Sequence, residues 1–502
     1  MIDTTKNWFQ LSQRQQISPF PNYLSMECIT KEMKGVIGVA YREDILILKE
    51  NIFYAFFDKY DHRRVGEAVL KKVLARPDIF VRFAKKQKVL AKGFYIFLKK
   101  NNNPKRLLKI SSKQLAALHE EYGKRYKEVY AMYFPILSVE NYLFGYLGDY
   151  VSKREVDTKK ASRYIDTLIT ERTAMVNRQE IIAALKVCIR IQKNKKWLSY
   201  FKKVHPKKIV AKINTDPALQ RLIKAHESRY YWITRDYEEP ILTYEDFVIR
   251  FKEHLRGNPK EALNKYAAED VKLEKDMASI YKKIKVNKKY QRLFQTMREG
   301  IYYKELRKSI VSQTLFLYDP ILKEIARRGT LSLRQVRHLR VSEVRKMLVQ
   351  NKDMTHELNE RIKLSVWHVH NGKLTVYTGS PARKYYNFFV RVNKKAKIFQ
   401  GMPVSPGLAT GRVKVVINKD DFHKVKKGDI IVSIQATPIF THVLSMASAL
   451  ICDGGPGITS HPATLARESG IPGIIGLRMV TKVLKDGDIV EVDGNRGIVK
   501  KV

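Results

Sequence analysis

The segment 449–472 constrains the fold of this chain more than any other part of the sequence. It opens with four apolar residues, a length and composition typical of a buried strand, and continues through a loop that contains three glycines. Thr459 and Ser460 follow, and both are residue types that cap helices. The pattern therefore predicts a strand, a glycine-rich loop and a helix over 462–469, with His461 at the N-terminus of the helix.

A histidine in this position is suited to phosphoryl chemistry. The first turn of a helix leaves backbone N–H groups unpaired and carries the positive end of the helix dipole, so an anion is stabilised there. The neutral imidazole of His461 can attack a phosphoryl group, and the hydroxyls of Thr459 and Ser460 can then donate hydrogen bonds to it. The alternative is that His461 is an ordinary histidine of a capping region.

The same segment resembles the signature of the phosphohistidine, or swivelling, domain of the PEP-utilising enzymes. This family includes phosphoenolpyruvate synthase, pyruvate phosphate dikinase and rifampicin phosphotransferase. The matching residues are Gly457, Thr459, Ser460, His461, Ala463, Ala466, Arg467, Glu468, Gly470, Ile471 and Pro472. The resemblance implies that His461 is the catalytic residue and carries the phosphoryl group, which Gly457, Thr459, Ser460 and Arg467 stabilise.

Flanking residues extend the resemblance over 398–502, because 401–413 is similar to the opening strand pair of the domain and 492–499 to its closing one. Three residues depart from the family pattern. Pro456 stands where a second loop glycine is usual, Pro462 replaces the usual alanine after the histidine, and His442 replaces an upstream proline. All three bear on the geometry of the loop, and none removes the nucleophile.

The complete enzymes of this family load the histidine with an ATP-grasp domain, and some unload it with a PEP-binding barrel. The sequence contains no phosphate-binding loop of the Gly-x-x-x-x-Gly-Lys-Ser/Thr kind, no Gly-Gly-Lys opening and no eightfold β/α repeat. We therefore expect no cofactor in this chain. ATP with Mg²⁺, or PEP, is expected on a partner, an ATP-grasp protein, and the acceptor is expected to be a small molecule.

The charge of the chain is strongly positive, at +45 from 95 Lys and Arg against 50 Asp and Glu. Residues 401–502 hold 13 basic and 9 acidic side chains, a balance of +4, so the excess belongs to the first 400 residues. Such a field attracts phosphorylated metabolites, RNA or an acidic partner, and its effect weakens with salt. Because short basic runs are typical of solvated helix faces, nucleic acid is possible but not the favoured partner.

Membrane, secreted and metal-binding classes are not indicated. No apolar run is long enough to span a bilayer, and the N-terminus lacks an apolar core of signal-peptide length. Cys28, Cys188 and Cys452 form neither a disulfide framework nor a metal-ligand spacing. His368 and His370 share one face of a predicted strand, but we expect no carboxylate or cysteine partner nearby, so we predict no metal. The expected location is the cytoplasm.

The fold class predicted is a mostly α-helical N-terminal and middle region followed by a swivelling β/β/α domain. Strand pairs are expected at 36–41 with 45–48, and at 364–378 around Asn371-Gly372, a strong signal for a type I′ turn. The predicted domains are 1–110, a small α/β or helical region; 111–350, a helical middle that binds the acceptor or a partner; 351–397, a hairpin and hinge; and 398–502, the phosphohistidine domain. We place the hinge at 385–401.

Two functions compete on these observations. Residues 222–247 are similar to the helical middle region of the rifampicin-phosphotransferase-like branch, and this resemblance implies acceptor-pocket roles for His226, Tyr231 and Trp232, with core packing as the alternative. The first function is a phosphotransferase component that works through His461. The second is a basic protein that binds nucleic acid or protein and keeps a catalytically silent swivelling domain, but such a scaffold has no need for a histidine at that helix end.

Overall fold

The computed structural model describes the chain except for residues 16, 51, 173–174, 236–239, 391–394, 437–439, 456, 459 and 478. Its contacts divide the chain into two compact units. The first unit comprises Met1–Tyr146 and Tyr318–Val502, and the second comprises Leu147–Leu317. In the part of the chain that is described, no helix is both long and apolar enough to cross a membrane.

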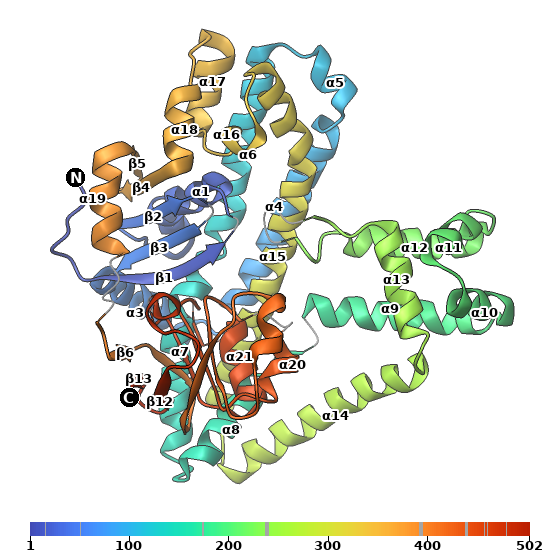
Figure 1. Cartoon of the computed structure of the whole chain (residues 1–502), viewed down its shortest axis with the longest axis vertical. Coiled ribbons are helices and arrows are strands. Elements are labelled where there is room, and N and C mark those ends of the chain that lie inside the picture. Colours follow the sequence, from blue (N-terminus) through green and yellow to red (C-terminus); the bar gives the residue numbers. More distant parts are fainter. Residues whose placement is uncertain are drawn as a thin grey trace. The chain divides into compact units, whose positions relative to one another are not determined.

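A five-stranded antiparallel sheet forms the centre of the N-terminal part of the first unit. Its strands are β1 (Trp8–Gln15), β2 (Glu43–Lys49), β3 (Ile52–Asp58), β4 (Leu364–His370) and β5 (Lys373–Tyr377), in the order β1-β3-β2-β4-β5. Figure 1 shows the blue strands β2 and β3 in one layer with the orange β4, which follows them by more than 300 residues. The sheet thus joins segments from both ends of the sequence.

The hairpin predicted around Asn371-Gly372 is confirmed. β4 and β5 pair in antiparallel register, and Asn371 and Gly372 have φ angles of 49° and 77°, as a type I′ turn requires. The strand predicted at 36–41 is wrong. Residues up to Ile37 belong to α2 (Met33–Ile37), which Gly38 ends in the left-handed conformation that glycine adopts without strain.

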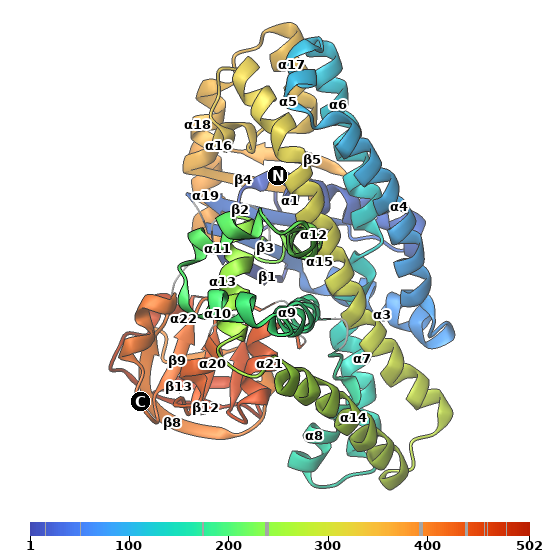
Figure 2. The same ribbon diagram turned by 90° about the vertical axis from the view of Figure 1, so that its right-hand side faces the viewer.

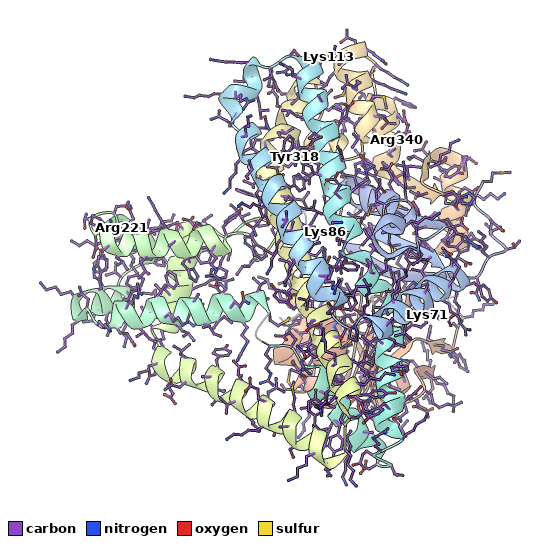
Figure 3. All side chains as sticks on the ribbon, turned by 180° about the vertical axis from the view of Figure 1, so that it is seen from behind. Lys71, Lys86, Lys113, Arg221, Tyr318 and Arg340 are labelled. Carbon is purple, nitrogen blue, oxygen red and sulfur yellow. The ribbon has the colours of Figure 1, made fainter. Side chains whose placement is uncertain are left out.

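The first unit also contains a set of helices. They are α1 (Pro19–Thr30), α3 (Lys59–Ala75), α4 (Ile79–Asn101), α5 (Pro104–Lys109), α6 (Ser112–Ala131), α16 (Leu333–Val336), α17 (Val341–Gln350), α18 (Thr355–Lys363) and α19 (Gly379–Phe389). Of these, α1, α3, α18 and α19 pack on the strands of this sheet. Stacked aromatic rings hold the helices together: Tyr122 of α6 lies 3.6 Å from Tyr318, and Tyr23 of α1 lies 5.2 Å from Trp367 of β4, between ring centroids. Tyr318 is labelled in Figure 3.

Among its described residues, the second unit contains helices joined by turns and loops, and no strand. It consists of α8 (Thr158–Ile169), α9 (Val176–Gln192), α10 (Lys195–Lys203), α11 (Pro206–Ile213), α12 (Pro217–Tyr230), α13 (Tyr244–His254) and α14 (Pro259–Lys283). Two long helices, α7 (Phe134–Ser152) and α15 (Lys288–Arg328), have residues in both units. A core of buried side chains from α9 to α13 stabilises this unit.

The C-terminal residues of the first unit form an eight-stranded sheet in the order β6-β13-β12-β8-β9-β10-β11-β7. Figure 2 shows this part in orange and red. Its elements are β6 (Ile398–Gln400), β7 (Met402–Ser405), β8 (Leu408–Val415), the 3-10 helix η1 (Lys419–Lys424), β9 (Ile430–Ser433), α20 (Thr441–Leu444), β10 (Ala449–Cys452), α21 (His461–Glu468), β11 (Gly473–Ile475), α22 (Val480–Val483), β12 (Ile489–Asp493) and β13 (Ile498–Lys501). The predicted fold class, a mostly helical chain with a C-terminal domain of strands and short helices, is confirmed.

Candidate functional site

The site is built on β10 and the loop that connects it to α21. β10 pairs in parallel with β9 on one side and with β11 on the other, and its four residues are fully buried. The loop leaves the carboxyl end of β10, the edge at which open parallel sheets commonly bind ligands. The structure contains the predicted strand, the connecting loop and the helix. Local sequence signals were sufficient to predict them.

His461 is the first residue of α21, one position earlier than the predicted start of the helix. Ser460 is the N-cap residue, with the extended backbone that a cap adopts (φ −69°, ψ 157°). Its side chain nevertheless makes no capping hydrogen bond, and its buried hydroxyl has no hydrogen-bond partner among the described residues. This hydroxyl therefore remains available for a group at the helix end, whereas Thr459 lies outside the described residues.

Arg467, predicted to stabilise the phosphate, is one helical turn and a half beyond His461. Its guanidinium donates to the carbonyl oxygens of Ile458 at 2.9 Å and Val404 at 3.2 Å. These bonds tie the loop before the histidine to β7. The structure thus shows Arg467 supporting the loop, and a direct contact with phosphate stays a prediction.

Gly457 makes a close contact with α7 within the first unit. A Cβ atom at this position would lie 2.3 Å from Oε1 of Glu140 and 3.0 Å from Oδ1 of Asn141, closer than real side chains approach. The next residue, Ile458, donates its backbone N–H to Asn141 Oδ1 at 3.3 Å. A larger residue at position 457 would therefore force the side chains of Glu140 and Asn141 to shift, and a role of Gly457 toward phosphate stays a prediction.

Asp453 is a buried acidic residue of the loop that the sequence reasoning missed. It accepts hydrogen bonds from the backbone N–H of Thr481, at 3.2 Å, and from the Thr481 hydroxyl. Burial raises the pKa of Asp453 to about 6, although the bonds from Thr481 oppose this shift. The carboxyl thus fastens the start of the loop to α22. The sequence did contain a signal for this role, because Asp453 directly follows an apolar strand and precedes two glycines.

The residues predicted to form an acceptor pocket belong to the second unit. His226 is buried, with Nε2 3.1 Å from Oε1 of the equally buried Glu180, and Trp232 is buried with its indole N–H donating to the carbonyl of Arg229. Tyr231 is partly buried and packs on Phe316, with ring centroids 4.9 Å apart. These contacts give all three residues packing roles, and their part in a pocket stays a prediction.

His368 and His370 do lie on one face of β4, with their rings stacked 5.9 Å apart. The expectation that no carboxylate is near them is wrong, because β2 pairs with β4 and brings Glu43 Oε2 to 3.1 Å from His368 Nε2. Lys6 forms an ion pair with the same carboxylate. Burial lowers the pKa of His368 to about 4. Among the described residues, no group of three or more His, Cys, Asp or Glu side chains is arranged to hold a metal ion.

Comparison with known proteins assigns a class to this part of the chain. Residues 425–497 match the family "PEP-utilising enzyme, mobile domain", a range that includes His461. The predicted resemblance is therefore confirmed.

Three relatives illustrate the similarity. A probable phosphoenolpyruvate synthase of Archaeoglobus fulgidus is 37% identical over 140 residues, 26% of this chain and 18% of that protein. The phosphoenolpyruvate synthase of Aeropyrum pernix is 46% identical over 103 residues, 20% of this chain and 12% of that protein. A Bacillus subtilis protein named "Uncharacterized phosphotransferase" is 43% identical over 110 residues, 22% of this chain and 13% of that protein. The chain thus spans less than a fifth of the length of each of these relatives.

Proposed function

We propose that this protein is a phosphotransferase component that carries a phosphoryl group on His461 from a nucleotide or PEP site on a partner to an acceptor. The match of residues 425–497 to the PEP-utilising mobile domain supports a role of this class. The names of its relatives, phosphoenolpyruvate synthases and a phosphotransferase, support enzyme chemistry at the same coarse level.

One observation supports the site assignment above the others. His461 begins α21, and the first turn of a helix leaves backbone N–H groups without intrahelical partners. The adjacent Ser460 hydroxyl is buried without a partner among the described residues. An unpaired buried hydroxyl has a free-energy cost. A phosphoryl group on His461 would accept a hydrogen bond from it and remove that cost, and the helix dipole would stabilise the phosphate charge.

The proposed chemistry has two balanced steps. In the first, a neutral imidazole nitrogen of His461 forms a P–N bond while the P–O bond to the donor breaks, and the leaving oxygen keeps the electron pair. In the second, an acceptor hydroxyl loses its proton to water and its oxygen forms a new P–O bond. The P–N bond then breaks and its electron pair returns to the imidazole, which is ready for another cycle.

The nucleotide site is proposed to lie on a partner. Transfer from ATP needs a divalent cation and cationic side chains fixed around the phosphates. Lysines dispersed over exposed helix faces do not provide such preorganised contacts. We expect an ATP-grasp protein to hold ATP with Mg²⁺, or another partner to hold PEP, and the purified chain by itself not to hydrolyse ATP.

Chemical phosphorylation tests the site without the partner. Incubation with phosphoramidate, a small donor that phosphorylates accessible histidines, should label the intact chain, and the label should be acid-labile and base-stable. His461→Ala should lose the label at this position. His423→Ala, which changes an exposed histidine of η1 in the same domain, should keep it.

Mass spectrometry locates the modified residue. Phosphate found only on serine or threonine would contradict the assignment of His461. Failure of any ATP-grasp protein encoded near this chain to transfer label from ATP to His461 would favour the alternative, a binding protein with a silent domain.

A further inference from the structure

One strongly uneven charge distribution lies in the helical part of the first unit, outside residues 398–502. Residues 79–119 contain 11 basic side chains and no Asp or Glu. They form α4, α5 and the first part of α6 in the first unit. A solvated surface that only keeps a protein soluble normally mixes both signs of charge, so an uninterrupted positive stretch of this length calls for a specific partner.

A comparison of two long helices shows that the lysine-rich composition of the protein does not by itself explain the absence of acidic residues from α4. α4 has 23 residues, of which seven are basic and none is acidic. α14 has 25 residues, of which six are basic and five are acidic. Like charges three or four residues apart destabilise a helix by a few tenths of a kcal/mol per pair. The charge of α4 therefore opposes its own stability, whereas that of α14 does not.

Five of the seven basic residues of α4 form one exposed surface, here named the α4 basic face. It consists of Lys85, Lys86, Lys92, Lys99 and Lys100, all exposed to solvent. Among the described residues, none of these five ammonium groups lies within ion-pair distance of a carboxylate; the nearby Asp78 pairs with Arg82 at 2.5 Å. Figure 3 labels Lys86 on this helix. The positive charge of this face is thus left for an external anion.

The α4 basic face is held on a rigid support. The opposite side of α4 is buried and packs on α6, and Gln87 donates its side-chain amide to the carbonyl of Val129 at 2.9 Å. At the other end, Arg106 of α5 donates to the Lys100 carbonyl at 2.7 Å. With a rise of about 1.5 Å per residue, Lys85, Lys92 and Lys99 recur about every 10 Å along one side of the helix.

A rigid row of cations suits a polymer with regularly spaced negative charges. Nucleic acid is such a polymer, and neutralising its phosphates releases counterions that favour binding. A lipid surface fits less well, because the apolar side of α4 is already buried against protein, and only the scattered aliphatic side chains Val89 and Ile96 point outward, 72% and 59% exposed. We propose that the α4 basic face, continued by Lys105 and Lys109 of α5, docks the phosphodiester backbone of a nucleic acid.

This proposal is independent of the phosphotransferase role, and the full-length chain tests it. Fluorescence anisotropy would measure its binding to single-stranded RNA, double-stranded RNA and double-stranded DNA of about 20 nucleotides per strand, between about 50 and 200 mM salt. Binding to any of the three that depends on the α4 basic face supports the proposal, and the three probes show whether RNA, DNA or both are bound.

Two triple variants that remove the same number of positive charges show whether binding depends on the location of the charges or only on the net charge. K85Q/K92Q/K99Q removes three cations of the α4 basic face, and K265Q/K272Q/K275Q removes three exposed cations of α14. The first should weaken binding about tenfold or more and lower the log–log salt slope by about 2, and the second should change the affinity by less than about twofold. Thermal melting checks that both variants are folded.

Three outcomes would overturn the proposal. They are equal weakening by the two triple variants, the absence of binding to all three nucleic acids at the lowest salt concentration, and binding through the α4 basic face to phosphatidylglycerol vesicles but not to nucleic acid. The last outcome would identify a membrane surface instead.

Discussion

The buried ion pair of Arg361 and Glu343 shows how single residues contribute to the stability of the first unit. Arg361 of α18 is buried and donates to both carboxylate oxygens of Glu343, at 2.7 and 2.8 Å, and to the carbonyl of His338. Arg340 donates to the same carboxylate at 2.7 Å. Burial raises the pKa of Glu343, but the hydrogen bonds and charge of Arg361 outweigh burial and bring it down to about 2. The carboxylate is therefore charged at all ordinary pH values.

Removing this charge should be costly. Glu343→Gln leaves the buried guanidinium of Arg361 without its main partner and should lower the free energy of unfolding by about 3–5 kcal/mol. Glu360→Gln, which breaks an exposed pair with Lys363 on the same helix, should cost less than about 1 kcal/mol. Urea unfolding followed by tryptophan fluorescence measures both, because Trp367 is buried beside Arg361. Equal effects of the two variants would contradict the structure.

Asp453 should make the folding stability fall as pH rises, whereas Glu343 makes it rise. Its pKa is about 6 in the folded chain against an ordinary value of 3.8, so between these pH values the folded state binds more protons than the unfolded state. Folding stability at this residue is therefore greatest below pH 4 and decreases as pH rises through 6, whereas the contribution of Glu343 is complete above pH 4.5 and is lost as pH falls toward 2.

The variant Asp453→Asn removes the pH dependence of stability that Asp453 contributes. The variant should be more stable than the native chain near pH 7, by an amount on the order of 2 kcal/mol, and the difference should vanish near pH 4. Amide hydrogen exchange in β10, corrected for intrinsic rates, provides the measurement. A variant less stable than the native chain at pH 7 would show that the hydrogen bonds from Thr481 to Asp453 matter more than the burial of charge.

At the level of elements, short-range signals account for the starts and ends that were predicted correctly. Ser111 accepts a hydrogen bond from the backbone N–H of Gln114, whose side chain accepts one from the Ser111 N–H, and this reciprocal capping box begins α6. The β4–β5 turn is decided in the same local way by Asn371-Gly372. Each of these signals needs only three or four consecutive residues.

The turn gives a prediction with an internal control. Gly372→Ala places a Cβ atom on a residue with φ of 77° and should destabilise the chain by about 1–2 kcal/mol. Gly35→Ala puts the same methyl group into α2, where φ is not left-handed and no atom lies within 4 Å. This second variant should stabilise the chain by up to about 1 kcal/mol. Thermal unfolding measures the stability of both variants. Destabilisation by the same amount in each would contradict the assigned turn.

At the level of the whole molecule, the C-terminal mobile-domain region has a sheet and a core made of its own residues. All eight strands of its sheet lie within 398–502, and its core is built from residues of the same range, with Val413, Ile430, Ile451 and Val490 fully buried. A fragment of residues 396–502 should therefore fold alone. A cooperative thermal transition in circular dichroism would support this prediction, and an unfolded fragment would contradict it.

Domain motion follows from the proposed function, because a carrier histidine has to reach a loading site and a delivery site. The predicted hinge, 385–401, should be the first place at which a protease cuts, releasing a folded fragment of about 100 residues. Glu140 lies against Gly457, four residues before His461, and a phosphoryl group on His461 would add negative charge to this part of the molecule. Cleavage should therefore become faster after treatment with phosphoramidate, and an unchanged rate would argue for a fixed domain.

The sequence by itself determined the features that depend on neighbouring residues. The helix that follows the glycine loop, to within one residue of its start at His461, the Asn371-Gly372 turn and the helical character of most of the chain could all be predicted. Caps, turns and amphipathic periodicity are local interactions. The candidate nucleophile was found for the same reason, since its signature is a continuous segment.

The tertiary structure alone decided which distant residues meet. Glu140 and Asn141 contact the loop at Gly457 and Ile458 from more than 300 residues away, and pairing of β2 with β4 brings Glu43 to His368. No periodicity encodes these contacts, because they depend on how helices and strands pack once long loops have closed. The same packing buried His226 against Glu180. Composition therefore identified a positively charged chain, and only the fold placed its charges in pairs, in the core or on an open face.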